Sequence, residues 1–135
     1  MTFSEQELTV KLVDELYRLQ KVWFEVPNMG QSVDIVVDVD GRLAFVEVKV
    51  KNWSKAIQQC KAHELVADYI YVAIATKRIP EDLIAEAKKN GYGLIHYNWD
   101  YCCWELVIES CVNNNVWMPQ RLILNKKLKM IDYAN

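Results

Sequence analysis

The chain has 135 residues, of which 52% are apolar and 25% are charged, and this length and apolar content suit one domain spanning residues 1–135. It contains no apolar run of about 18 residues or more, so we expect no membrane span. The N-terminus lacks the pattern of a secretion signal, which makes the cytoplasm the expected location. The net charge of −2 excludes a strong overall attraction to nucleic acid, so any contact with DNA must come from local basic patches.

A helix is predicted over about residues 4–20. Ser4 and Glu7 have the spacing of a capping box, and Phe3 and Leu8 have the spacing of a hydrophobic staple. The apolar stripe of this helix is formed by leucines at helical spacing: Leu8, Leu12, Leu16 and Leu19.

A hairpin is predicted over residues 33–51. The dipeptide Asp40-Gly41 separates two alternating runs, and it favours a two-residue turn because both central residues of that turn need positive φ. The turn fixes the register and places Asp34 directly opposite Glu47, with Lys49 pointing the same way. The other face of the hairpin is apolar and is formed by Val33, Ile35, Val37, Ala44, Val46 and Val48.

The other elements follow from periodicity and from boundary signals. Residues 22–26 alternate in a short strand that Pro27 ends, and Asn52 or Ser54 caps a second helix. In chain order, the remaining predicted elements are this helix to about residue 66, a strand over 68–76, a helix over 80–90, strands over 93–98 and 102–109, and a helix over 120–131.

The cysteines do not predict a metal site or a disulfide framework. Cys60, Cys102, Cys103 and Cys111 lack the spacing of either arrangement. Cys60 and His63 would share a helix face, but two further zinc ligands are missing. We therefore expect reduced thiols and no zinc, and we also expect no nucleotide cofactor.

Two like charges directly opposed on neighbouring strands repel each other, so the pairing of Asp34 with Glu47 calls for a reason. A divalent cation held between the two carboxylates is one reason. The alternative is an exposed charged face of an edge hairpin, in which Lys49 bridges two solvated acids.

The order helix, three strands, helix, strand, together with Asp34 and the segment Glu47-Val48-Lys49, resembles the PD-(D/E)XK nuclease superfamily. Residues 5–8 and 46–50 are most similar to archaeal Holliday junction resolvases and to small phage and prokaryotic endonucleases. The resemblance implies an α/β fold with a restriction-endonuclease-like core (αβββαβ), a mixed sheet flanked by helices, and a C-terminal helix–strand–strand–helix extension.

The resemblance also implies a function, namely metal-dependent hydrolysis of DNA phosphodiester bonds, with branched or junction DNA among the expected substrates. Asp34 and Glu47, joined by the main-chain carbonyl of Val48, would bind Mg²⁺ or Mn²⁺, and Glu5 would complete the shell. Lys49 would orient or help deprotonate the attacking water and offset charge on the phosphodiester.

Two of these assignments have competitors within the sequence. Glu7 and Glu15 are alternatives to Glu5, although Glu7 has a sufficient explanation as a helix cap. Gln59 would hold the water or the phosphate, and the neighbouring Gln58 is the alternative.

The chain departs from the family pattern at two places. Val33 stands where the motif has its proline, and His63 stands four residues after Gln59, where relatives of the RecB type have a tyrosine. His63 and His96 are interpreted as structural residues.

Lys51, Lys55 and Lys61 lie beside the predicted site and are the expected nucleic-acid contacts. A second cluster either follows a phosphate backbone or is a solvated face: Arg121, Lys126, Lys127 and Lys129. The aromatic residues of the C-terminal part form core or a dimer surface: Trp99, Tyr101, Trp104 and Trp117. We expect a homodimer, because the domain is small and similar resolvases cut two strands.

Two other functions compete with the nuclease. The first is a catalytically silent module of the same fold that binds nucleic acid or a protein partner, but such a module has no need of Lys49. The second is a glycoside hydrolase using two carboxylates, which leaves Lys49 and the basic flank unexplained.

Overall fold

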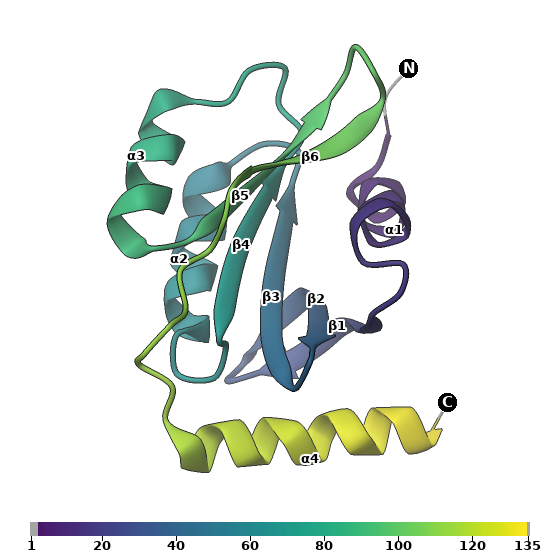
Figure 1. The fold of residues 1–135 in the computed structure, drawn as a ribbon, viewed down its shortest axis with the longest axis vertical. Coiled ribbons are helices and arrows are strands. Elements are labelled where there is room, and N and C mark those ends of the chain that lie inside the picture. Colours follow the sequence, from purple (N-terminus) through teal and green to yellow (C-terminus); the bar gives the residue numbers. More distant parts are fainter. Residues whose placement is uncertain (1–2, 135) are drawn as a thin grey trace.

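The structure, a computed structural model, describes residues 3–134 of the chain. Its elements follow the order expected from the sequence (Figure 1). Their bounds are α1 Glu5–Leu16, β1 Lys21–Asn28, β2 Gln31–Val39, β3 Arg42–Lys49, α2 Trp53–His63, β4 Tyr69–Ile74, α3 Glu81–Asn90, β5 Gly93–Asn98, β6 Cys103–Ile108 and α4 Met118–Ala134. None of these helices, within the described part of the chain, combines the length and the apolar character that crossing a bilayer requires.

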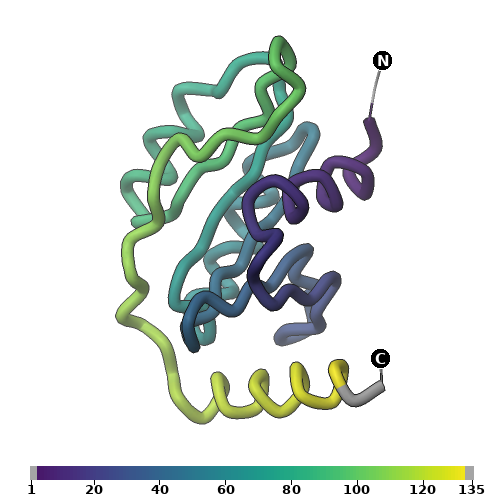
Figure 2. Tube along the Cα trace, turned by 45° about the vertical axis from the view of Figure 1, so that its right-hand side comes forward, coloured from purple at the N-terminus to yellow at the C-terminus, as the bar shows by residue number. Residues whose placement is uncertain are grey.

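The strands form one mixed sheet in the order β1-β2-β3-β4-β5-β6. The central strands β3, β4 and β5 are parallel, whereas the remaining neighbours pair antiparallel. Helix α1 covers one face, α2 and α3 cover the other, and α4 crosses the end of the sheet at which the β2–β3 turn lies (Figures 1 and 2). Two apolar cores result, one on each face of the sheet.

The β2–β3 turn has the predicted geometry. Asp40 and Gly41 have φ values of 52° and 88°, and the Gly41 amide donates to Oδ1 of Asp38 at 2.8 Å. The ladder runs from Val39 opposite Arg42 to Ile35 opposite Val46. The register read from the turn is therefore confirmed along the recorded ladder.

The predicted face of Val33 is wrong. Val33 packs in the core beneath α2 with Val36 and Phe45, not with Ile35 on the α1 face. The alternation of β2 breaks at Asp34, and the facing strand is irregular at the same level: Glu25, between the pairs Phe24–Ile35 and Val26–Val33, has a left-handed backbone with φ 49°. A residue in this conformation interrupts the alternation of side chains, so strand parity does not extend across it.

Three predicted boundaries also differ from the structure. β1 continues through Pro27, which an edge strand tolerates because its outer side needs no N–H donor. Helix α1 has the predicted capping box at Ser4 but ends at Leu16, which leaves Leu19 93% exposed. Helix α2 ends at His63, three residues before the predicted end.

Arg121 does not belong to an exposed basic cluster, contrary to one of the two readings of the sequence. It is 8% exposed, and its Nη1 donates to the Val66 carbonyl at 3.0 Å and to Oδ2 of Asp68 at 2.8 Å. Its Nη2 donates to the Gly41 carbonyl at 3.4 Å. Arg121 therefore fastens α4 to the end of the sheet.

The Arg121 contacts give a stability prediction. Arg121→Met should lower the free energy of unfolding by about 1–3 kcal/mol, because it removes the Arg121 donor to the buried Val66 carbonyl and the positive partner of Asp68. The exposed Lys126 on the same helix is the matched control, and Lys126→Met should change it by less than about 0.5 kcal/mol. Urea unfolding followed by circular dichroism measures both, and equal effects of the two variants would contradict the anchoring role.

Candidate active site

The candidate site lies where the parallel strands end. β3, β4 and β5 run in the same direction, so their C-terminal ends meet at one edge of the sheet. Hydrogen bonds join these ends, because Ala75 N donates to the Lys49 carbonyl at 3.0 Å and Trp99 Nε1 donates to the Ala75 carbonyl at 2.8 Å. Asp34 and Glu47 lie at this edge, just beyond the last recorded β2–β3 pair.

Beyond the end of the β2–β3 ladder, the carboxylates of Asp34 and Glu47 make the hydrogen bonds between the two strands. The Asp34 amide donates to Oε1 of Glu47 at 3.3 Å. The Val48 amide donates to Oδ2 of Asp34 at 2.7 Å. Each carboxylate thus accepts a main-chain N–H from the opposite strand, so these two hydrogen bonds hold the acids near each other beyond the end of the ladder.

The environment of Asp34 favours its protonated form. Burial, and next to it the charge of the nearby Glu47 carboxylate, raise the pKa of Asp34 to about 6. The Val48 amide and the positive charge of Lys49 act in the opposite direction. Without a further cation, the site therefore holds negative charge at a cost at neutral pH.

Glu47 is the most deeply buried acid of the site, with an exposed fraction of 0%. Its Oε1 accepts from Asp34 N and contacts His63 Nε2 at 3.2 Å, whereas its Oε2 is buried and has no hydrogen-bond partner among residues 3–134. Gln59 Oε1 is also buried without a partner. Buried oxygens without donors are rare in folded proteins, and a bound cation or an ordered water would satisfy them.

His63 is a site residue that the sequence interpretation treated as merely structural. It is 0% exposed, and its Nδ1 lies 3.3 Å from Nδ2 of Asn28. The signal in the sequence was its spacing of four residues from Gln59, which places both side chains on the same face of α2. What the spacing does not reveal is the contact with Glu47.

Glu5 reaches the site from the first turn of α1. Its Oε2 accepts from the Val50 amide at 3.2 Å, and together with Asp34 and Val48 it lines a cleft of about 770 Å³. Of its two competitors, Glu7 is engaged in the helix cap with Ser4.

Glu15, the other competitor of Glu5, is held elsewhere. It pairs with Lys11 at 2.9 Å and accepts from the Trp104 amide at 2.7 Å. Glu5 is therefore the α1 acid that the fold brings to Asp34.

The predicted basic and amide residues differ in their exposure and in whether they line a hollow together with Asp34. Lys49 is half-buried, and its positive charge lowers the pKa of Asp34. A hollow of about 570 Å³ is lined by Asp34, Lys55 and both glutamines: Gln58 and Gln59. Gln58 is exposed and Gln59 is half-buried.

The two remaining lysines lie further out. Lys51 and Lys61 are exposed and are outside the linings of both the cleft and the hollow beside Asp34. Lys55 is therefore the best placed of the three predicted nucleic-acid contacts.

The donor set suits a hard divalent cation that keeps some of its water. No three His, Cys, Asp or Glu side chains converge as a complete metal site within residues 3–134. Asp34 and Glu47 offer two carboxylates, with one unpaired oxygen on Glu47, and further oxygens would come from the Val48 carbonyl and from water. Mg²⁺ binds in this manner, through one or two carboxylates and several waters.

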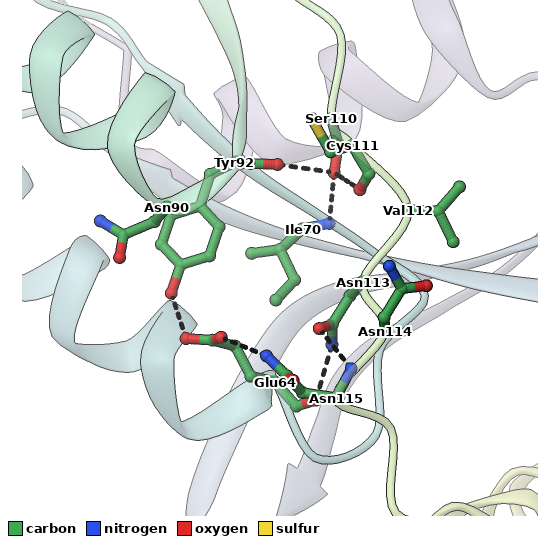
Figure 3. Close-up of a pocket in the computed structure, with 11 residues that line it drawn as sticks. Glu64, Ile70, Asn90, Tyr92, Ser110, Cys111, Val112, Asn113, Asn114 and Asn115 are labelled. Atoms are coloured by element: carbon green, nitrogen blue, oxygen red, sulfur yellow. Dashed lines mark hydrogen bonds between the residues drawn. The ribbon is translucent and has the colours of Figure 1, made fainter.

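Another hollow, of about 280 Å³, lies near the opposite end of β4 and β5 (Figure 3). Polar groups that line it are engaged with one another, since Tyr92 Oη donates to Oε2 of Glu64 at 2.8 Å and Asn113 Nδ2 donates to the Glu64 carbonyl at 2.6 Å. These bonds fasten the segment after β6 to the end of α2. We therefore assign it a structural role.

The raised pKa of Asp34 gives a stability prediction. The folded state holds the Asp34 proton more tightly than the unfolded chain does, so folding loses stability as pH rises from about 4 through 6. Asp34→Asn removes this loss. After allowance for solvent screening, the metal-free variant should be more stable than the parent by on the order of 1 kcal/mol at pH 7.5.

Urea unfolding in EDTA at pH 4 and pH 7.5 measures this difference. The comparison at pH 4 serves as the control, because both side chains are then largely neutral. A variant that is less stable than the parent at pH 7.5 would show that the Asp34 carboxylate is not held at a cost.

Comparison with known proteins identifies the fold. No family model and no curated protein sequence matches the chain. Among solved structures, a repair endonuclease from Pyrococcus abyssi matches with a TM-score of 0.51 and 22% identity over 70% of this chain. Pyrococcus furiosus SfsA in complex with Ca²⁺ matches with a TM-score of 0.45 and 13% identity over 79% of this chain.

The chain spans 46% of the repair endonuclease and 64% of SfsA. At these identities the likeness concerns the fold alone. The chain therefore has a mixed α/β fold with a six-stranded sheet flanked by helices, similar to that of a repair endonuclease.

Proposed function

We propose that this chain is a metal-dependent endonuclease that hydrolyses DNA phosphodiester bonds. The observation that carries the proposal is the pair of opposed carboxylates, Asp34 and Glu47, with an unpaired buried oxygen on Glu47 and Lys49 beside them. The fold supports it, because a repair endonuclease has a similar arrangement of elements. The order of elements and the Asp34, Glu47 and Lys49 set further support membership of the PD-(D/E)XK superfamily.

In the proposed site, Asp34, Glu47 and the Val48 carbonyl hold Mg²⁺ or Mn²⁺, and Glu5 contributes directly or through water. The cation would supply a nucleophile at neutral pH and stabilise charge on the phosphate oxygens. The protein provides the two carboxylates in a fixed relative position, because each is bonded to the main chain of the opposite strand.

The two remaining groups act on the substrate side. Lys49 places a positive charge near Asp34, where it can orient the attacking water and offset charge on the phosphodiester. Gln59 has an oxygen without a donor, and in the proposed site this oxygen accepts from the attacking water.

DNA reaches the site along basic residues close to it. Lys55 lines the same hollow as Asp34, and Lys51 and Lys61 extend the positive charge along the chain. Because the overall charge is −2, these local lysines must supply the attraction to phosphate. Two such sites in a homodimer would cut both strands of a branched or junction substrate.

A cleavage assay tests the proposed function. Linear, flapped and four-way junction DNA are incubated with the parent protein in Mg²⁺, in Mn²⁺ and in EDTA. We expect cutting that requires the metal, and Lys49→Ala should slow it by roughly 100-fold or more because a charge at the reacting phosphate is lost. Lys89→Ala on the exposed surface of α3 is the matched control and should cut at the rate of the parent.

Failure to cut any substrate while the protein binds DNA would favour a catalytically silent module. Equal cutting by the parent and by Lys49→Ala would contradict the role of Lys49 without removing the nuclease assignment.

Reversing the charge of single lysines tests where the DNA lies on the protein. Lys55→Glu should weaken DNA binding measured by fluorescence anisotropy and reduce its dependence on salt by about one phosphate contact. Lys61→Glu is a matched change further along α2, outside the hollow lined by Asp34, and should have a smaller effect. A larger effect at Lys61 would place the DNA elsewhere on α2.

A further inference from the structure

A buried polar chain leads from the end of β1 to the candidate site. It consists of Asn28, His63 and Glu47, which are 2%, 0% and 0% exposed. Asn28 Nδ2 lies 3.3 Å from His63 Nδ1, and His63 Nε2 lies 3.2 Å from Oε1 of Glu47. Three elements, β1, α2 and β3, thus meet through side-chain hydrogen bonds inside the core.

The direction of these hydrogen bonds follows from the amide. The nitrogen of Asn28 can only donate, so with the amide oriented as in the structure His63 Nδ1 is the acceptor. The ring proton then resides on Nε2, which donates it to Oε1 of Glu47. Asn28 therefore selects the tautomer that bonds the acid.

Packing fixes the position of the His63 ring. Phe45 lies edge-on to it, with ring centroids 5.1 Å apart and an interplanar angle of 68°. Cys60, on the same helix, is also 0% exposed. Because the interior of a protein is close-packed, the imidazole cannot turn away from Glu47 without displacing its neighbours.

The two oxygens of Glu47 consequently differ. Oε1 accepts from two donors, Asp34 N and His63 Nε2, whereas Oε2 has none within the described part of the chain. Turning the carboxylate would break both bonds at Oε1, so the His63 bond helps to keep Oε2 free in one place.

We propose that His63 is a positioning residue, which holds Oε1 of Glu47 so that Oε2 remains available to a divalent cation. The inference rests on the proposed function, since it assigns a partner to the same metal site. Hydrogen-bonding partners of metal ligands commonly fix ligand orientation, and their loss typically weakens metal binding by about 10–100-fold.

The test measures Mn²⁺ binding without DNA, by electron paramagnetic resonance of the free ion. His63→Phe keeps a ring but removes the donor, and should weaken Mn²⁺ binding by about 10–100-fold. His63→Gln restores an N–H donor and should recover most of the affinity. Ile57→Val is the matched control, because Ile57 is a buried apolar residue of the same helix: the variant should lower the melting temperature and leave the Mn²⁺ affinity unchanged.

A second variant covers the case in which His63→Phe does not fold. Asn28→Ala keeps His63 but removes the bond that selects its tautomer, and a smaller loss of Mn²⁺ affinity is expected. Unchanged affinity in the folded variants, or equal losses in His63→Phe and His63→Gln, would overturn the positioning role. A parent protein that binds no Mn²⁺ would overturn the proposed function together with this inference, whereas binding unaffected by the variants would overturn the inference alone.

Discussion

The structure depends on the burial of one carboxylate, that of Glu47, between a sheet and the helix that covers it. The side chain is 0% exposed, yet only one of its oxygens is hydrogen-bonded to the residues that the structure describes. Burying a charged or polar group without full compensation costs free energy, so the rest of the molecule must be stable enough to impose it. Two apolar cores, one on each face of the sheet, provide that stability.

Each neighbouring element contributes a group to this arrangement. The tight turn after β2 sets the register of the hairpin as far as Ile35 and Val46, next to Asp34 and Glu47. Helix α1 brings Glu5 to the end of β3, and α2 brings His63 to Glu47. The resulting cluster has an excess of acids and oxygens without donors. Such a cluster lowers the stability of the folded protein and at the same time offers ligands to a cation. A local loss of stability of this kind is expected at functional sites.

Local signals in the sequence predicted the parts of the fold that are determined locally. The turn at Asp40-Gly41 and the helix cap at Ser4 depend on a few adjacent residues, and both have the expected form. The turn register also predicted the pairs from Val39–Arg42 to Ile35–Val46. Asp34 and Glu47 lie beyond this ladder, and hydrogen bonds from their carboxylates to the opposite strand hold them there.

The parts that sequence reasoning missed depend on contacts between distant segments. Glu25 has a left-handed backbone although it is not a glycine, so nothing in the sequence indicates this irregularity. The change of face at Val33 therefore could not be predicted from the alternation of apolar residues. Arg121 can be buried because Asp68 and the Gly41 carbonyl accept its hydrogen bonds. His63 can be buried because it contacts Glu47, which lies on another element. Burial of such polar residues becomes visible only when both partners are placed in space.

A crystal structure of the protein grown with Mn²⁺ and without DNA tests the central claim most directly, because the anomalous signal locates the ion independently of any activity. The proposed site predicts one dominant peak within coordinating distance of the Asp34 carboxylate and of Oε2 of Glu47. A folded protein with no peak between these two acids, or with Mn²⁺ bound only elsewhere, would contradict the claim that this pair of carboxylates is a metal site.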